Sequence, residues 1–112
     1  MVTSDTFLKI AFSLPGTEQN PHFDRVAFKV TGRRIFASLL EESNSANIKL
    51  SLEEQKVFCE YDASAIYPVP NKFGLQGWTT FDLSKVSQEL VSEALLSAYN
   101  DVLADKKKKA KG

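Results

Sequence analysis

The sequence predicts an α+β domain with two layers, in which helices lie on one face of an antiparallel β-sheet. Apolar and polar residues alternate in three consecutive segments and again in a later one, which is the periodicity of strands with one buried face. Apolar residues at helical spacing come before, between and after these segments. Because the first three strands follow one another directly and helices flank them, we expect the order α-β-β-β-α-β-α, with the helices gathered on one face.

The three consecutive strands are joined by short turns. Their residues are 26–30, 33–40 and 46–50. Gly32 lies between the first two strands and can take the positive φ that a tight hairpin needs. The polar segment 41–45 supplies the second turn. In strict alternation Phe36 and Leu40 fall on the polar side, so we expect that side to be partly covered or used.

Helix signals come before these strands. Ser4 can cap a first helix, which Pro15-Gly16 ends. Residues 17–24 then form a connector that can hold a short edge strand, where Pro21 opposes regular ladder pairing.

The second half of the chain holds two more helices and one more strand. Ser51 and the glutamate three residues later form a capping box, which predicts the second helix. Residues 63–71 contain two prolines and are expected to form an extended loop. A fourth strand is expected at residues 78–83, and Ser84 or Ser87 begins the last helix.

The length of 112 residues is typical of one domain, which we expect over residues 1–105, followed by a disordered lysine-rich tail at residues 106–112. A single cysteine excludes an intrachain disulfide, and a hydrophobic content of 43% is enough for an ordinary core. The first residues do not have the pattern of a signal peptide, so we expect none, and no apolar run in the sequence is long enough to cross a bilayer. We therefore expect a cytoplasmic protein that does not insert into a membrane. The sequence leaves the oligomeric state open, with a monomer favoured.

Charge is distributed unevenly along the chain, although the formal net charge is zero. The tail holds five of the 14 basic residues and no acid, which leaves nine basic against 14 acidic residues, a net charge of −5, for residues 1–105. A globally basic nucleic-acid binder does not have this composition. The tail is either a non-specific anchor for nucleic acid or acidic lipid, or a solubilising terminus.

Short motifs follow one another in a fixed order over about residues 8–103. They are Leu14-Pro15-Gly16, Glu18, His22-Phe23, Ala27-Phe28-Lys29-Val30, Ile48-Lys49-Leu50, Tyr67-Pro68, Lys72, Gly77-Trp78, Asp82-Leu83 and Ser97-Ala98-Tyr99. Their order and spacing resemble those of the MmcQ/YjbR family of small bacterial proteins. Two positions depart from the family pattern, since Asp24 stands where glycine is frequent and Val26 stands where proline is frequent.

The resemblance implies a compact α+β fold with an antiparallel sheet, similar to the two-layer arrangement of type III secretion chaperones and CyaY-like proteins. It also implies DNA binding, which for the family is an inference from likeness to a double-wing transcription-factor domain. That is an analogy at the level of the fold.

A nucleic-acid site is expected on the polar side of the sheet and in the loop that follows the second helix. Its candidate residues are Lys29, Arg33, Arg34, Lys49, Lys72 and Trp78. The cations would contact phosphates, while Trp78 or Phe36 stacks on a base or wedges into a groove. The alternative is an ordinary solvated strand face, and the acidic second half of the chain opposes tight binding.

The loop from Tyr67 to Trp78 offers a second candidate site. It could form one wall of a ligand groove against the side of the sheet that carries the strand lysines, with His22, Phe28 and Tyr67 as candidate lining residues. The alternative is a packed loop whose tryptophan closes the core.

The sequence predicts no enzyme, no cofactor and no metal site. His22 is the single histidine and Cys59 the single cysteine, and a catalytic pair would also need an orienting group. Neither a metal-ligand spacing nor a glycine-rich phosphate loop is present. Three functions remain: DNA binding, which the resemblance favours, a protein-interaction or adaptor module, and small-molecule binding.

Overall fold

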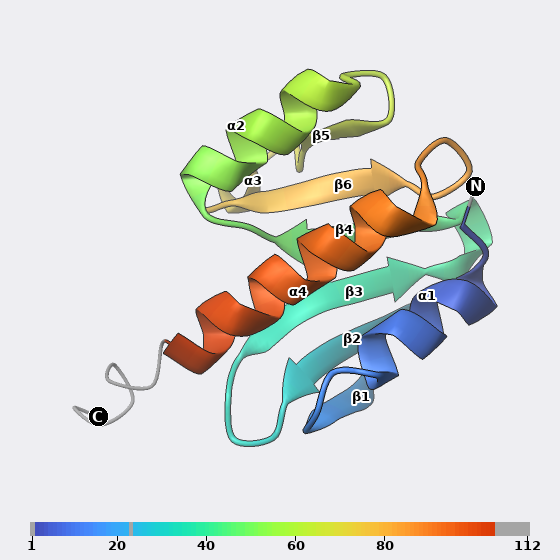
Figure 1. Ribbon diagram of the computed structural model, residues 1–112, viewed down its shortest axis with the longest axis vertical. Helices are drawn as coiled ribbons and strands as arrows, with labels where there is room; N and C mark the ends of the chain where they lie inside the picture. The colour runs from blue at the N-terminus through green and yellow to red at the C-terminus, as the bar shows by residue number, and fades with distance from the viewer. Residues whose placement is uncertain (1, 23, 105–112) are drawn as a thin grey trace.

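The computed structural model describes residues 2–22 and 24–104, and the expected tail lies outside them. Six strands form one antiparallel sheet in the spatial order β1-β2-β3-β4-β6-β5. Helices α1 and α4 lie across one face of this sheet, and α2 lies beside β5 and β6 (Figure 1). The elements are α1 (Ser4–Phe12), β1 (Thr17–His22), β2 (Arg25–Val30), β3 (Ile35–Leu40), η1 (Glu41–Ser43), β4 (Ser45–Lys49), α2 (Leu52–Tyr61), β5 (Ile66–Pro68), α3 (Lys72–Leu75), β6 (Trp78–Asp82) and α4 (Gln88–Ala104).

The predicted α+β class and antiparallel sheet are confirmed, and the structure adds strands β1 and β5 and the short helices η1 and α3 to the expected order. Strand β1 pairs with β2 along its whole length and forms one edge of the sheet, where proline is tolerated because one side of the strand needs no partner. Strand β5 lies within the expected loop and pairs with β6 at the other edge. Among the described residues, no helix is long and apolar enough to span a bilayer.

Hydroxyl side chains begin the three longer helices. The Thr3 side chain, and not that of Ser4, accepts the N–H of Thr6 at the start of α1. Ser51 accepts the N–H of Glu54 at the start of α2, which is half of the predicted capping box, while the Glu54 carboxylate accepts from the hydroxyl of Ser97 in α4. Ser87, one of the two predicted serines, accepts the N–H of Leu90 at the start of α4.

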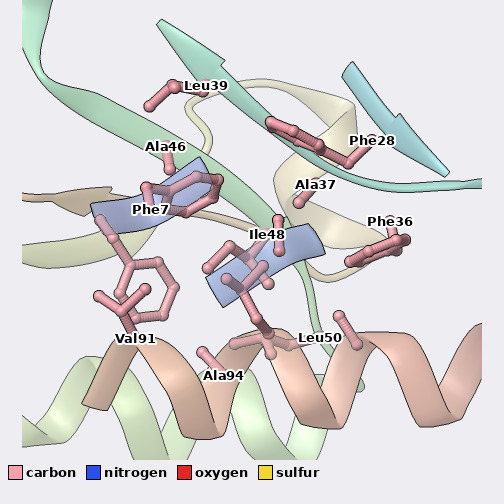
Figure 2. Close-up of a cluster of buried hydrophobic side chains, with 14 of the residues drawn as sticks. Phe7, Phe28, Phe36, Ala37, Leu39, Ala46, Ile48, Leu50, Val91 and Ala94 are labelled. Atoms are coloured by element: carbon pink, nitrogen blue, oxygen red, sulfur yellow. The ribbon is translucent and has the colours of Figure 1, made fainter. Parts of the chain in front are cut away.

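The core fills the space between the sheet and the helices (Figure 2). Phe7 from α1 packs on Phe28 from β2, with ring centroids 5.7 Å apart, and Ile48 from β4 faces α4. Helix α2 covers the other end of the sheet, where Phe58 meets Phe81 of β6 edge to face at 5.9 Å. These contacts bury one face of the sheet and leave the other without a covering helix.

A β-bulge in β3 changes which side chains face the core. Phe28 pairs with Ala37, but the next residue of β2 pairs with Ile35, so Phe36 is the extra residue of β3. Phe36 and Ala37 are therefore both fully buried, and Phe36 meets Tyr99 of α4 edge to face. The expectation that Phe36 reaches a nucleic acid is wrong, because the bulge turns its ring into the core.

Candidate functional site on the helix-free face

The sheet face that carries no helix presents a continuous row of paired residues. Ala27 pairs with Ser38, Ser38 with Asn47, Asn47 with Thr80, and Thr80 with Tyr67. Their neighbours along each strand point into the core, so the side chains of this row point away from the helices. We call this side the helix-free face, because the three longer helices lie on the opposite side and only the short helix α3 borders it (Figure 1).

A groove of about 420 Å³ lies on the helix-free face. Its floor comes from strands β2, β3, β4 and β6, and one wall comes from the segment between β5 and α3 together with the first turn of α3. The lining residues are Arg25, Ala27, Ile35, Ser38, Asn47, Val69, Asn71, Phe73 and Trp78. Aromatic and aliphatic surface thus alternates with a few polar groups, which is the usual character of a ligand site.

Two asparagine amides, an arginine and a serine are the polar side chains that line the groove. Thr80 donates its hydroxyl to Asn47 Oδ1 at 2.7 Å, and the Phe73 N–H donates to Asn71 Oδ1 at 2.8 Å. Both amide oxygens are thereby engaged, while neither amide nitrogen has an acceptor within the described part of the chain. Arg25 donates Nη1 to Ser38 Oγ at 3.2 Å and carries further N–H groups. No carboxylate is among the described residues that line the groove.

The groove wall is fixed from behind by α2. Gln55 Nε2 lies 2.9 Å from the carbonyl oxygen of Gly74, 3.2 Å from that of Trp78 and 3.2 Å from the hydroxyl of Thr79. Gly74 packs so closely that a Cβ there would lie 2.0 Å from the carbonyl oxygen of Val69. The wall is therefore packed, as one of the two readings of this loop expected, but Trp78 lines the groove and does not close the core.

Four of the six predicted nucleic-acid residues lie on or beside the helix-free face. Trp78 lines the groove, and Lys49 pairs with it across β4 and β6. Lys29 pairs with the groove residue Ile35, and Lys72 is the exposed first residue of α3 in the wall.

The two hairpin arginines are placed differently. Arg33 donates Nη1 to the carbonyl oxygen of Leu103 at 3.1 Å, so it caps the end of α4 on the helix side of the sheet. Arg34 is exposed in the turn and already makes another contact. Arg33 therefore does not join the cations of the helix-free face.

The three residues predicted to line a groove also separate. Tyr67 is 42% exposed and lies on the helix-free face beside Thr80. Phe28 points the other way and is fully buried, with the rings of Phe7 and Phe12 at 5.7 and 5.8 Å. It does not line the groove, because its position in β2 faces α1. The backbone of His22 belongs to β1, and its side chain lies outside the described residues.

Sequence reasoning missed Arg25, Ser38, Asn47 and Asn71. Strand alternation already put Ser38 and Asn47 on the same side as the strand lysines, so that signal was available. Asn71 before a short helix is a typical N-cap, but the prolines around it pointed to a loop. Arg25 was overlooked because the strand was expected to begin one residue later.

Charge separates between the two layers. Helices α1, α2 and α4 carry the acids Asp5, Glu53, Glu54, Glu60, Glu89, Glu93 and Asp101 against the bases Lys9 and Lys56. The strands carry Arg25, Lys29 and Lys49 on the helix-free face, with Glu18 and Asp82 as acids. Thr31 donates its hydroxyl to the Glu18 carboxylate at 2.6 Å. The helix-free face is thus the more cationic side of the described domain.

Cys59 is half-buried beside the core, and this burial raises the pKa of its thiol. A thiol with a raised pKa is a weak nucleophile at neutral pH. Across residues 2–22 and 24–104, no three side chains of the types that bind metals lie close together. The expectations of no catalysis and no metal site remain predictions.

A family model named YjbR matches residues 12–101. The chain belongs to the YjbR family. The crystal structure of Deinococcus radiodurans protein DR2400, described with family-model domain DUF419, is similar to this YjbR-family chain with a TM-score of 0.78 and 24% identity. The similarity covers 96% of this chain and 82% of that protein, and at this identity it shows a shared fold. No curated protein matches the chain.

Proposed function

We propose that this YjbR-family protein binds DNA as a single strand across the helix-free face. The observation that carries the proposal is the placement of Trp78 in a groove on the same face as Arg25, Lys29 and Lys49. Single-strand binding sites combine an aromatic surface, on which bases stack, with cations that follow the phosphates. A single strand can offer an unstacked base to a groove, whereas a duplex keeps its bases paired.

The charge distribution supports a single strand over a duplex. The net charge of residues 1–105 is −5, and the acids concentrate on the helices behind the sheet. A thin strand that follows the three strand cations stays away from the helix acids, and the acid that it passes is Glu18, which pairs with Lys29 across β1 and β2. A duplex carries about twice as many phosphates per unit length as a single strand, so the net negative charge of residues 1–105 opposes it more strongly.

Fluorescence anisotropy with a labelled single-stranded oligonucleotide of mixed sequence tests the proposal. We expect binding at low salt that survives deletion of residues 106–112. Three phosphate contacts predict a slope of about −2 for the logarithm of the binding constant against the logarithm of salt concentration. A matched duplex should bind more weakly.

Two double variants distinguish the contribution of the helix-free face to binding from that of the total charge of the protein. Lys29→Ala with Lys49→Ala should weaken binding several-fold and reduce the salt slope. Lys9→Ala with Lys56→Ala removes the same charge from α1 and α2 and should leave the slope unchanged. Absence of binding to the full chain at low salt, or binding that disappears with the tail, would refute the proposal.

Small-molecule binding is the second candidate, and the size of the groove favours it. Sites for small ligands typically enclose about 300–1,000 Å³ and mix apolar walls with a few oriented polar groups. Free nucleotides that change Trp78 fluorescence, together with no affinity for oligonucleotides, would favour this candidate. The adaptor function stays a prediction, since nothing in the groove bears on it.

A further inference from the structure

We infer that the groove holds one nucleobase of the keto type, guanine or thymine, in preference to adenine. This inference rests on the proposed function and specifies which part of the DNA single strand binds in the groove. It follows from the kind of hydrogen-bonding groups that line the groove, together with the apolar surfaces between them.

The polar lining offers more unused donors than acceptors, because each engaged amide oxygen keeps one lone pair whereas each amide NH₂ keeps both of its protons. Asn47 and Asn71 each have the amide oxygen engaged by a neighbour, which leaves the NH₂ groups for a ligand. Arg25 has donors only, and Ser38 accepts from it and can donate its own proton. A ligand that satisfies this lining must present several acceptors.

The bases differ in the acceptors that they present along one edge. Guanine presents O6 and N7 as adjacent acceptors, and thymine presents two carbonyl oxygens with the N3–H donor between them. Adenine places an amino donor beside its N7 acceptor, and this donor would face the NH₂ groups of the lining. A buried donor without a partner is costly, so adenine should bind less well.

Apolar side chains of the groove supply the faces on which a ring can stack. Trp78 and Ile35 belong to the floor, while Phe73 and Val69 belong to the wall. Phe73 is 49% exposed, so an added ring would cover apolar surface that now meets water. A volume of about 420 Å³ lies near the lower end of the range for small-ligand sites, which suits one base better than a stacked run.

Asn71→Asp tests the inference because it changes the hydrogen-bonding group and keeps the helix cap. Aspartate caps helices as well as asparagine does, so the Phe73 N–H keeps its acceptor. The groove, however, loses an NH₂ donor and gains an acceptor. Asn100→Asp, at an exposed position of α4, adds the same charge away from the groove and is the matched control.

The full chain is titrated with (dT)₁₀ and (dA)₁₀ while the fluorescence of Trp78, the single tryptophan, is recorded. We expect (dT)₁₀ to bind about tenfold more tightly than (dA)₁₀, in line with one good base contact. Asn71→Asp should bring this ratio close to one, and Asn100→Asp should leave it unchanged. The urea midpoint of each variant shows whether the fold is retained.

Failure of the inference and failure of the proposed function give different results. If both oligonucleotides bind and the ratio is the same in Asn71→Asp and in Asn100→Asp, the inference is wrong while DNA binding stands. If neither binds, the proposed function is wrong, and free dTMP and dAMP then decide the inference. Stronger quenching of Trp78 by dTMP supports a base site for small molecules, and equal or absent quenching overturns it.

Discussion

Replacement of Gln55 tests whether α2 holds the groove wall through hydrogen bonds. The Gln55 side-chain NH₂ has two protons and faces three acceptors, the carbonyl oxygens of Gly74 and Trp78 and the Thr79 hydroxyl. It can make two good hydrogen bonds at once. Each is worth about 0.5–1.5 kcal/mol net, so their loss should cost roughly 1–3 kcal/mol. Both carbonyl oxygens keep a second backbone N–H partner, which places Gln55→Met in the lower half of that range.

Gln55→Glu should be more destabilising than Gln55→Met at neutral pH. A carboxylate oxygen would face the same acceptors, which adds repulsion and roughly a further 1–3 kcal/mol. The same surroundings raise the pKa of the introduced carboxyl in the folded state. The extra cost is therefore fully present above that pKa, shrinks as the pH falls through it, and is absent below the unfolded value of about 4.3.

Urea unfolding followed by far-UV circular dichroism, at about pH 7.5 and about pH 4.5, measures these differences. Gln19→Glu introduces the same charge at an exposed position of β1 and serves as control. If Gln55→Glu is as stable as Gln55→Met at the higher pH, the Gln55 amide does not hold the wall. Gln55→Met should also weaken the preference for thymine over adenine. Gln55 holds Gly74, whose N–H donates to the carbonyl oxygen of Asn71, so the variant loosens the position of Asn71 in the wall.

Two further predictions concern the backbone and the bulge. Gly77→Ala should cost several kcal/mol more than Gly32→Ala, although both glycines have positive φ. A Cβ at Gly77 would lie 1.9 Å from a backbone oxygen, whereas a Cβ at Gly32 would meet no atom within 4 Å, so Gly32→Ala should cost only about 1–2 kcal/mol. Phe36→Ala should cost about 3–5 kcal/mol and Ile35→Ala less than about 1 kcal/mol, because the bulge buries the first side chain and leaves the second 38% exposed. Chemical denaturation checks both pairs, and equal losses within a pair would contradict the assigned environment.

The sequence could predict the fold class because its signals are local. Strand alternation, the proline that ends α1 and the Ser51 cap each depend on a few neighbouring residues. The pairing of β1 and β5 depends on distant partners. Pro21 argued against a regular strand, yet β1 is an edge strand and needs only one partner. Strand β5 has three residues, too few for a periodicity to show.

The candidate site was predictable in its location but not in its composition. Alternation placed Lys29, Lys49 and Trp78 on one side of the sheet, and the structure brings them to one face. The groove itself exists because the wall segment packs over four strands through contacts of Gln55 that no local pattern reveals. The contact of Arg33 also depends on a distant residue. The sequence places Arg33 in a hairpin turn, but its guanidinium donates to the carbonyl oxygen of Leu103 at the end of α4.

The bulge in β3 links the core to the groove. With strict alternation Ile35 would enter the core beside Ala37, and Phe36 would stand on the helix-free face. The extra residue instead gives Tyr99 of α4 an aromatic partner and frees Ile35 to line the groove. One inserted residue thus adds a large ring to the buried layer and a smaller aliphatic side chain to the site. Removal of the extra residue would restore strict alternation, so that position 35 would face the core and position 36 the groove. The shape of the groove and the packing under α4 are therefore linked and cannot change independently.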